Sequence, residues 1–279
     1  MKKISRRSFL AAAGLSVAAL ALTACGGSSA STASSVASSA ASSEAASTSA
    51  AAGELTTVEA GKLTMATNAT FPPYEMTTDA GEFEGIDIET AQAIADKLGL
   101  ELQIDDMDFD AALLSVQQGK ADIVMAGVTV TDERKAVMDF SDSYATGIQS
   151  IIVPNDSDIA SPDDLAGKKI GTQRGTTGYI YCSDDFGDDA VVAYDNGLTA
   201  VQALNNGQVD AVVIDNAPAK EYVAANPGLA ILDTSYAEED YAIGMAKGSS
   251  LEAAVNAALE ELKADGTLQA IVDKYITAE

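Results

Sequence analysis

Short apolar runs alternate with segments of helical period from about residue 62 to the end of the chain. Residues 62–67 alternate as a strand does, whereas 88–98 carry apolar residues at a helical period and are followed by Gly99, a common helix terminator. Further strands are predicted at 100–104, 123–125, 148–153, 168–172, 209–214 and 241–246, and helices at 110–118, 196–207, 251–262 and 267–275. Such alternation is typical of an α/β fold with mostly parallel sheets.

One pattern occurs twice in the chain, 88 residues apart. Residues 116–125 and 204–213 each contain the end of a helix, a glycine, an aspartate and an apolar strand. The repeat fits two lobes of similar build and places Gly127 and Asp215 at equivalent strand ends. Because α/β sheets bind ligands beyond the carboxyl ends of their strands, both positions are candidate ligand contacts.

The N-terminus has the features of an export signal. Four basic residues precede an apolar stretch at 9–22. Residues 5–10 resemble a twin-arginine signal, although general export signals also carry paired arginines. Leu-Thr-Ala-Cys at 22–25 resembles a bacterial lipobox, which implies removal of residues 1–24 and lipidation of Cys25. A membrane-spanning helix is the weaker alternative, because the apolar stretch is short and ends in small residues.

Residues 25–53, which begin with the lipidated cysteine, consist almost entirely of small residues that cannot bury a core, so we expect a disordered linker there. The whole chain has 16 basic and 42 acidic residues, a formal net charge of −26. That charge argues against nucleic acid or anionic lipid as a partner. The sequence contains no histidine, which excludes Ser-His-Asp and Cys-His catalysis, and we expect neither a metal nor a cofactor.

Arg134 is the residue on which the functional argument depends. A buried strand at 123–125 precedes Thr131, a good helix N-cap, and two acidic residues that suit the positive end of a helix dipole. A cation in the first turn is unfavourable there, unless Arg134 and the free helix amides bind an anion together. The alternative is a surface arginine paired with Glu133 or Asp132.

The stretch 126–144 resembles the AGxTxTxxRxxxxxFSxxY signature of the amino-acid-binding proteins of ABC importers, and the resemblance extends over about residues 61–276. It implies a two-lobed type II periplasmic-binding-protein fold, in which each lobe is a mostly parallel sheet flanked by helices and two chain crossings form the hinge. We expect residues 54–150 with 240–279 to form one lobe, and 151–239 to form the other.

The resemblance also implies roles for individual residues. Arg134 and Thr129 would hold the α-carboxylate of a ligand, a glycine-rich loop with Thr176 and Thr177 would grip it from the other lobe, and Asp215 would accept from the α-ammonium. Further ligand contacts would be Asn68, Phe71, Phe109, Ala126, Gly127 and Gln173. From the sequence alone, alternatives stay open: core aromatics for the phenylalanines, a plain turn for the loop and a helix cap for the aspartate.

The implied function is an extracytoplasmic lipoprotein, anchored to the outer face of the bacterial cytoplasmic membrane, that captures a free polar L-amino acid. It would act as a monomer and deliver the amino acid to a membrane permease with a cytoplasmic ATPase. The alternatives are an enzyme on the same fold, similar to cyclohexadienyl or arogenate dehydratase, and an amino-acid sensor domain. Asn68, Gln173 and Ile214 lack the side chains that often accompany cationic ligands or glutamine in this family, so we expect a neutral polar amino acid or cystine, while Arg174 leaves an acidic ligand open.

Overall fold

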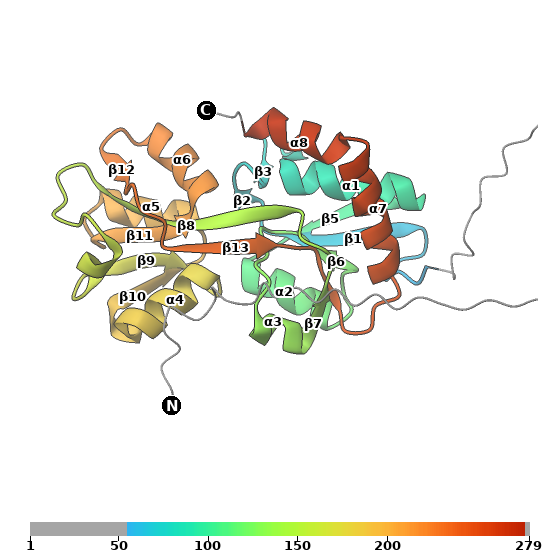
Figure 1. Cartoon of the computed structure of the whole chain (residues 1–279), viewed down its shortest axis with the longest axis horizontal. Coiled ribbons are helices and arrows are strands. Elements are labelled where there is room, and N and C mark those ends of the chain that lie inside the picture. Colours follow the sequence, from blue (N-terminus) through green and yellow to red (C-terminus); the bar gives the residue numbers. More distant parts are fainter. Residues whose placement is uncertain (1–54, 277–279) are drawn as a thin grey trace, which may run out of the picture. The chain divides into compact units, whose positions relative to one another are not determined.

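The computed structural model describes residues 55–276, which contain two large sheets with flanking helices and one small sheet (Figure 1). The predicted export signal, Cys25 and the linker lie outside the described residues. Among residues 55–276, no helix has the length and apolar character needed to cross a membrane.

The first sheet has the order β5-β1-β6-β14-β7. Its parallel half consists of β5 (Glu101–Asp106), β1 (Lys62–Thr67) and β6 (Ile123–Val124), and its antiparallel half adds β14 (Gly244–Ala246) and β7 (Met138–Phe140). Five helices belong to this half of the molecule: α1 (Ile86–Leu98), α2 (Phe109–Gln117), α3 (Asp132–Val137), α7 (Glu252–Ala264) and α8 (Thr267–Tyr275). A small sheet of β2 (Thr70–Phe71), β3 (Glu75–Thr77) and β4 (Phe83–Glu84) follows β1.

The second sheet has the order β10-β9-β11-β8-β12, and β13 also pairs with β8. Its parallel half consists of β10 (Val191–Tyr194), β9 (Ile170–Gln173) and β11 (Ala211–Asp215). Its antiparallel half consists of β8 (Ala145–Pro154), β12 (Leu229–Ile231) and β13 (Ala237–Tyr241). The helical elements are α4 (Thr177–Phe186), α5 (Gly197–Asn205), α6 (Asn216–Ala225) and the short turns η1 (Pro162–Leu165) and η2 (Asp188–Ala190).

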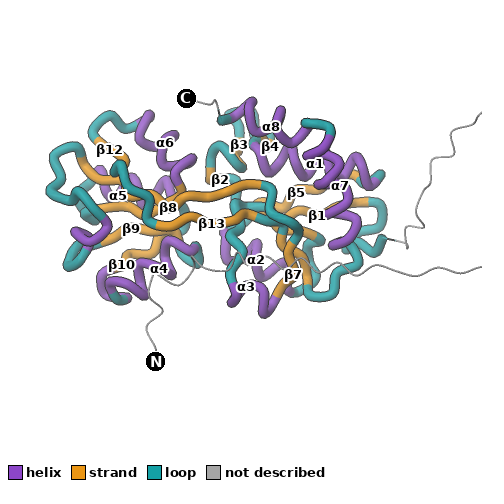
Figure 2. The backbone as a smooth tube through the Cα atoms, viewed as in Figure 1, coloured by secondary structure: helices purple, strands orange, loops and turns teal. Residues whose placement is uncertain are grey.

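Two adjacent strands connect the halves. β8 and β13 are antiparallel, with Ala145 paired to Tyr241 and Gln149 to Ala237, and Figure 2 shows them as the long paired segments between the two groups of helices. The strand predicted at 241–246 is wrong in one respect: it is two strands, because β13 ends in the second sheet at Tyr241 and β14 begins in the first at Gly244. The chain therefore leaves and re-enters the first half at neighbouring points.

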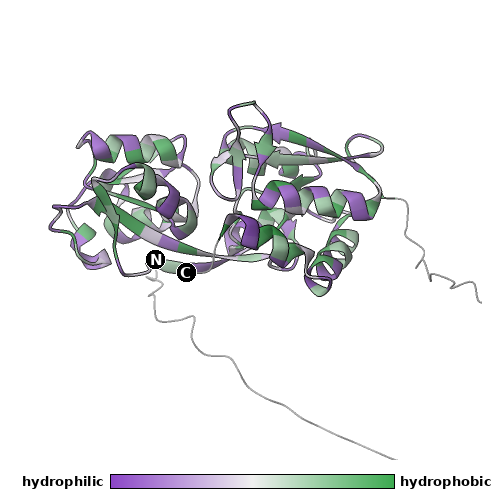
Figure 3. Ribbon diagram, turned by 90° about the horizontal axis from the view of Figure 1, so that it is seen from above, coloured by the Kyte–Doolittle hydropathy of each residue, from purple (hydrophilic) through white to green (hydrophobic). Residues whose placement is uncertain are grey.

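The predicted α/β class with two sheets is confirmed, and each sheet is mixed, with one parallel and one antiparallel half. Apolar strands lie inside each half, and polar residues gather on the outer faces of the helices (Figure 3). The apolar period along 110–118 and 196–207 predicts Leu114 and Leu198 on the apolar face of each helix, but the structure leaves them 49% and 45% exposed. The buried residues of α2 are Phe109, Ala112, Leu113, Ser115 and Val116, and the adjacent Leu114 lies outside this face.

The sequence repeat has the same structure in both halves. Asp122 accepts a hydrogen bond from the amide of Thr64 (2.8 Å) and returns one from its own amide to the Thr64 carbonyl (2.9 Å). Asp210 forms the same pair with the backbone of Lys169, at 2.7 and 2.8 Å. Each aspartate thus ties the start of one strand to its parallel neighbour, and β6 and β11 occupy the same third place in their sheets.

Candidate functional site

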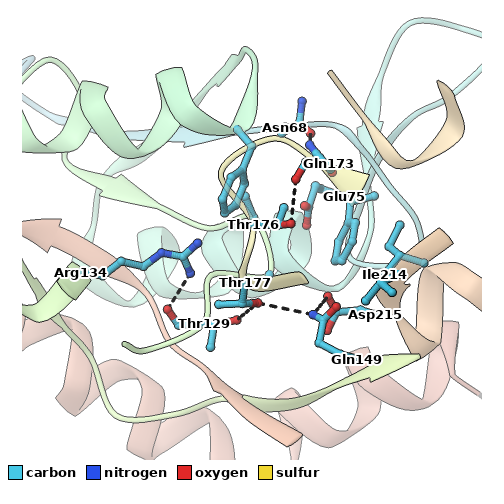
Figure 4. A pocket seen from close by; sticks show the side chains of 15 residues that line it. Asn68, Glu75, Thr129, Arg134, Gln149, Gln173, Thr176, Thr177, Ile214 and Asp215 are labelled. Atoms are coloured by element: carbon cyan, nitrogen blue, oxygen red, sulfur yellow. Dashed lines mark hydrogen bonds between the residues drawn. The ribbon is translucent and has the colours of Figure 1, made fainter. Parts of the chain in front are cut away.

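One pocket brings together every ligand-binding residue predicted from the sequence (Figure 4). Its lining comes from both halves, since Arg134 belongs to α3 beside the first sheet and Asp215 ends β11 in the second. The free volume is ≈ 20 Å³, about the space of one water molecule. Four lining residues were not predicted, namely Glu75, Gln149, Val213 and Ile214.

Arg134 is buried, with 8% of its surface exposed, so the alternative of a solvated surface arginine is wrong. Thr131 accepts from the Arg134 amide (3.1 Å), which confirms the predicted N-cap. The guanidinium donates to the carbonyls of Thr129 (2.8 Å) and Gly175 (3.2 Å) and lies 5.3 Å from the centre of the Phe109 ring. Burial lowers the pKa of Arg134, but an arginine stays charged in a protein. The site therefore contains a buried cation with further N–H groups to offer.

Asp215 supplies the opposite charge. It stands at the N-cap position of α6, but its side chain forms no capping hydrogen bond. The alternative of a helix-capping aspartate is therefore wrong. One carboxylate oxygen accepts from Gln149 Nε2 (2.7 Å) and the other from the Tyr241 hydroxyl. Burial raises the pKa of Asp215 to about 7, although these two hydrogen bonds act in the other direction. A positive group at this position would compensate for the burial of the carboxylate.

Direct contacts join the two halves at the pocket. Gln173 Nε2 donates to Asn68 Oδ1 (2.8 Å), and the hydroxyls of Thr129 and Thr177 lie 3.5 Å apart. Gly127 has a positive φ of 55°, and a Cβ there would lie 2.8 Å from the Phe71 ring. The close packing of this backbone against the Phe71 ring in the pocket wall therefore requires a glycine.

The Thr176 hydroxyl forms its hydrogen bonds within its own loop and helix. It donates to the carbonyl of Gln173 (2.8 Å) and accepts from the amide of Tyr179 (3.3 Å), which caps α4. Ala126 is buried beside Gly127 in the pocket wall. For both residues a ligand contact stays a prediction. Because the Thr176 hydroxyl is already bonded within the loop, Thr176 would contact a ligand through its backbone.

Comparison with known proteins identifies the family. Residues 63–278 match the bacterial extracellular solute-binding proteins, family 3. The chain belongs to this family. It is 34% identical over 225 residues to the L-cystine-binding protein TcyJ of Escherichia coli K12, covering 79% of this chain and 85% of the relative. It is 33% identical over 228 residues to the arginine-binding extracellular protein ArtP of Bacillus subtilis, covering 78% and 87%.

Solved structures of similar proteins agree with the fold of this solute-binding protein. An ancestral arginine-binding protein bound to glutamine superimposes with a TM-score of 0.75 at 42% identity, covering 78% of this chain and 99% of the other. AbpA of Streptococcus pneumoniae, bound to L-arginine, superimposes with a TM-score of 0.73 at 38% identity, covering 77% and 94%. The matched family is one of solute-binding proteins and these relatives are named as binding proteins, so the chain is a solute-binding protein.

Glu239 is a buried carboxylate of this solute-binding protein that the sequence analysis missed. It lies on β13, and its Oε2 atom accepts from Thr177 Oγ1 (2.9 Å), Gln149 Nε2 (3.0 Å) and Thr129 Oγ1 (3.2 Å). A signal was present in the sequence, because in a strand Glu239 faces the same side as the fully buried Tyr241, two residues on.

Glu75 is a second missed acid. It is fully buried in the pocket wall, and in the described part of the chain neither of its carboxylate oxygens has a hydrogen-bond partner. Burial and the neighbouring Asp87 carboxylate raise the pKa of Glu75 well above its usual range. Asp87 itself accepts from the Gly127 amide (3.0 Å) and the Tyr144 hydroxyl (2.8 Å). Within residues 55–276, Oδ1 of Asp87 also lacks a partner, but of the two acids only Glu75 lines the pocket, so its acceptors are the ones that a ligand can reach.

Proposed function

We propose that this protein binds a free polar L-amino acid for an ABC importer, with Arg134 on the α-carboxylate and Asp215 on the α-ammonium. The observation that carries the proposal is the presence of this buried cation and this buried anion in one pocket, on different halves of the molecule. A zwitterion satisfies both charges, whereas a ligand with one charge leaves the other buried and unpaired. The relatives named for cystine, arginine and glutamine support the same ligand class.

Binding and release would require the halves to separate. We propose that residues 54–150 with 240–279 form one lobe, that 151–239 form the other, and that the chain segments at the ends of β8 and β13 act as the hinge. An amino acid does not fit a free volume of ≈ 20 Å³, so the pocket has to open to admit one. Ligand contacts made with both lobes at once would then favour the closed form.

Glu75 changes the expected side chain of the ligand. Asn68 had argued against a cationic amino acid, but a buried acid with free acceptors favours a side chain that ends in N–H donors. We propose a guanidinium, ammonium or amide group there, with Phe71 and Phe109 beside the rest of the side chain. Glu75→Gln should weaken binding of L-arginine more than binding of L-glutamine in calorimetric titrations. Equal losses for both amino acids would contradict this assignment.

The membrane anchor and the transport partner are part of the same proposal. Cys25 would carry the lipid and residues 26–53 the tether, so that the solute-binding domain stays beside its permease and the cytoplasmic ATPase. A tagged fatty acid supplied to the cells should label the wild-type protein but not Cys25→Ala, and the two proteins should have the same amino-acid affinity. Equal labelling of the variant would contradict the lipobox assignment.

The test of the main proposal is a thermal-shift screen with the proteinogenic L-amino acids and L-cystine. A ligand that binds only the folded protein raises the melting temperature, and a concentration of about 100 times Kd adds ~2.7 kcal/mol of stability. At least one amino acid should give a clear shift, and Arg134→Ala should abolish it. No shift with any amino acid would contradict the proposed function.

A further inference from the structure

The hydrogen bonds to Glu239 determine how two threonine hydroxyls of the pocket are oriented. Its Oε2 atom accepts hydrogen bonds from the hydroxyl of Thr177 in the second half (2.9 Å) and from the hydroxyl of Thr129 in the first half (3.2 Å). A carboxylate only accepts, so both hydroxyls must be the donors in these bonds. A hydroxyl has a single hydrogen, and each hydrogen is therefore directed at Glu239. What Thr129 and Thr177 can still offer to a ligand is their lone pairs.

Gln149 extends the same network to Asp215. Its amide nitrogen has two hydrogens, and it lies 3.0 Å from Glu239 Oε2 and 2.7 Å from Asp215 Oδ2. The Thr177 hydroxyl oxygen lies farther from this nitrogen, at 3.5 Å, so both hydrogens are assigned to the carboxylates and Gln149 holds the two acids in one arrangement. Asp215, Thr129 and Thr177 line the pocket, while Glu239 is outside its lining.

We propose that Glu239 is a positioning residue for the α-ammonium subsite: it turns the hydroxyls of Thr129 and Thr177 into acceptors, so that these two residues bind the ligand's ammonium together with Asp215. The inference rests on the proposed function and refines it. The resemblance to the family had assigned Thr129 and Thr177 to the carboxylate, but hydroxyls that donate to Glu239 cannot also donate to a ligand carboxylate.

The number of groups fits this assignment. An α-ammonium has three N–H donors, and Asp215, Thr129 and Thr177 provide three acceptors. The carboxylate of the ligand is left to the Arg134 guanidinium, which uses two of its N–H groups on the carbonyls of Thr129 and Gly175. Each end of the zwitterion then faces groups that match its hydrogen-bonding character.

The test measures the preference for an α-amino group rather than the affinity alone. Calorimetric titrations compare L-arginine with 5-guanidinopentanoic acid, and L-glutamine with glutaramic acid, since each second compound lacks only the ammonium. Glu239→Gln is the test variant, because an amide can donate and lets a hydroxyl turn around. Glu238→Gln is the matched control, since Glu238 is the exposed neighbour on the same strand.

Glu239→Gln should reduce the preference for the amino acid over its desamino analogue by about 10-fold or more, a difference of ~1.4 kcal/mol. The analogue itself should bind the variant about as well as it binds the wild type, because its carboxylate still meets Arg134. The control Glu238→Gln should leave the preference unchanged. A Glu239→Gln protein that loses affinity equally for both members of a pair would show that the residue supports only the fold, and would overturn the inference.

Thr177→Val gives a second route if Glu239→Gln does not fold. Loss of this hydroxyl should lower the same preference, and Thr177→Ser should restore it. If Thr177→Val instead weakens the desamino analogue as much as the amino acid, the hydroxyl serves the carboxylate and the inference is wrong. If the wild-type protein binds no amino acid, the proposed function is wrong and this inference fails with it. If the wild type binds an amino acid but the variants show the same preference as the wild type, only the inference is wrong.

Discussion

The two sheets bring different chemistry to the pocket from the same repeated unit. In the first half, β6 leads to Gly127, whose lack of a side chain admits Phe71, and then to Arg134 at the start of α3. In the second half, β11 ends at the carboxylate of Asp215 itself. The aspartates that tie each strand to its neighbour are equivalent, and the groups beyond the strands have opposite charge. A repeated scaffold can therefore recognise a zwitterion when only its strand ends differ.

Removal of the charge on either side should have the largest effect. Arg134→Ala and Asp215→Asn should each weaken amino-acid binding by about 100-fold or more, ~3 kcal/mol, because each leaves a charged end of the ligand buried and unpaired. Calorimetric titration measures both. Arg174→Ala is the control. The Arg174 side chain is 58% exposed, and its removal should leave amino-acid affinity unchanged. Full affinity in either charge variant would contradict the claim that each half supplies one of the two charges that bind the ligand.

The acid of the second half should also make the stability of the ligand-free protein depend on pH. The pKa of Asp215 is raised from 3.8 in the unfolded chain to about 7 in the folded protein, so folding takes up a proton between these values. Stability is therefore greatest at low pH and falls as the pH rises through this range, by at most about 1.4 kcal/mol per pH unit.

Melting temperatures measured between about pH 5 and 8 check this dependence. Asp215→Asn should flatten the slope, while Asp195→Asn should not, because the side chain of Asp195 is 77% exposed. A slope that is the same in wild type and Asp215→Asn would assign the pH dependence to other groups. Added amino acid should oppose the slope, since its ammonium favours the ionised form of the carboxylate.

Variants of a contact between the halves, at Gly175, should distinguish effects on closure of the pocket from effects on folding stability. This glycine has a φ of 74°, and a Cβ there would lie 1.6 Å from Asp110 Oδ1. Gly175→Ala should lower stability by ~1 kcal/mol through backbone strain and should also weaken binding several-fold through the clash. The double variant with Asp110→Ala should regain affinity without regaining melting temperature. Recovery of both, or of neither, would contradict the assignment of the clash to closure.

The smallest expected effect comes from a hydrogen bond outside the pocket lining. Tyr222 of α6 donates to the carbonyl of Thr70 in the other half (2.8 Å). Tyr222→Phe should weaken binding by about 5-fold, ~1 kcal/mol, because this bond favours the closed arrangement. Tyr236→Phe makes the same chemical change where the hydroxyl donates to Asp185, within the second half (2.6 Å), and should leave affinity unchanged.

The sequence predicted the elements with a strong local pattern and the residues with a recognisable motif. The helix cap at Thr131 and the aspartates of the repeat follow from spacing and residue type alone, whereas the role of Arg134 was predicted only through the resemblance to the family motif. The mixed character of the sheets did not, because their antiparallel strands come from segments distant in sequence, such as β14 beside β6. Local pattern carries no information about such pairings.

The sequence analysis also missed two residues of the connecting strands, because alternation along a strand can indicate a buried side chain but not its hydrogen-bond partners. Gln149 and Glu239 lie on β8 and β13, and their importance depends on the hydrogen bonds that those strands form across the pocket. Glu75 follows a loop with two prolines, but only its complete burial distinguishes it from the many surface acids of this chain. The motif thus located the charged ends of the site, and the tertiary structure supplied the groups that hold them.

The most direct test of the central claim uses ligands that lack one charged end. The amino acid with the largest thermal shift, its N-acetyl derivative and its carboxamide are titrated calorimetrically into the wild-type protein. If Arg134 and Asp215 bind the two ends of the zwitterion, both derivatives should bind about 100-fold more weakly or not at all. A derivative that binds within about 3-fold of the free amino acid, a difference of less than ~1 kcal/mol, would contradict the account.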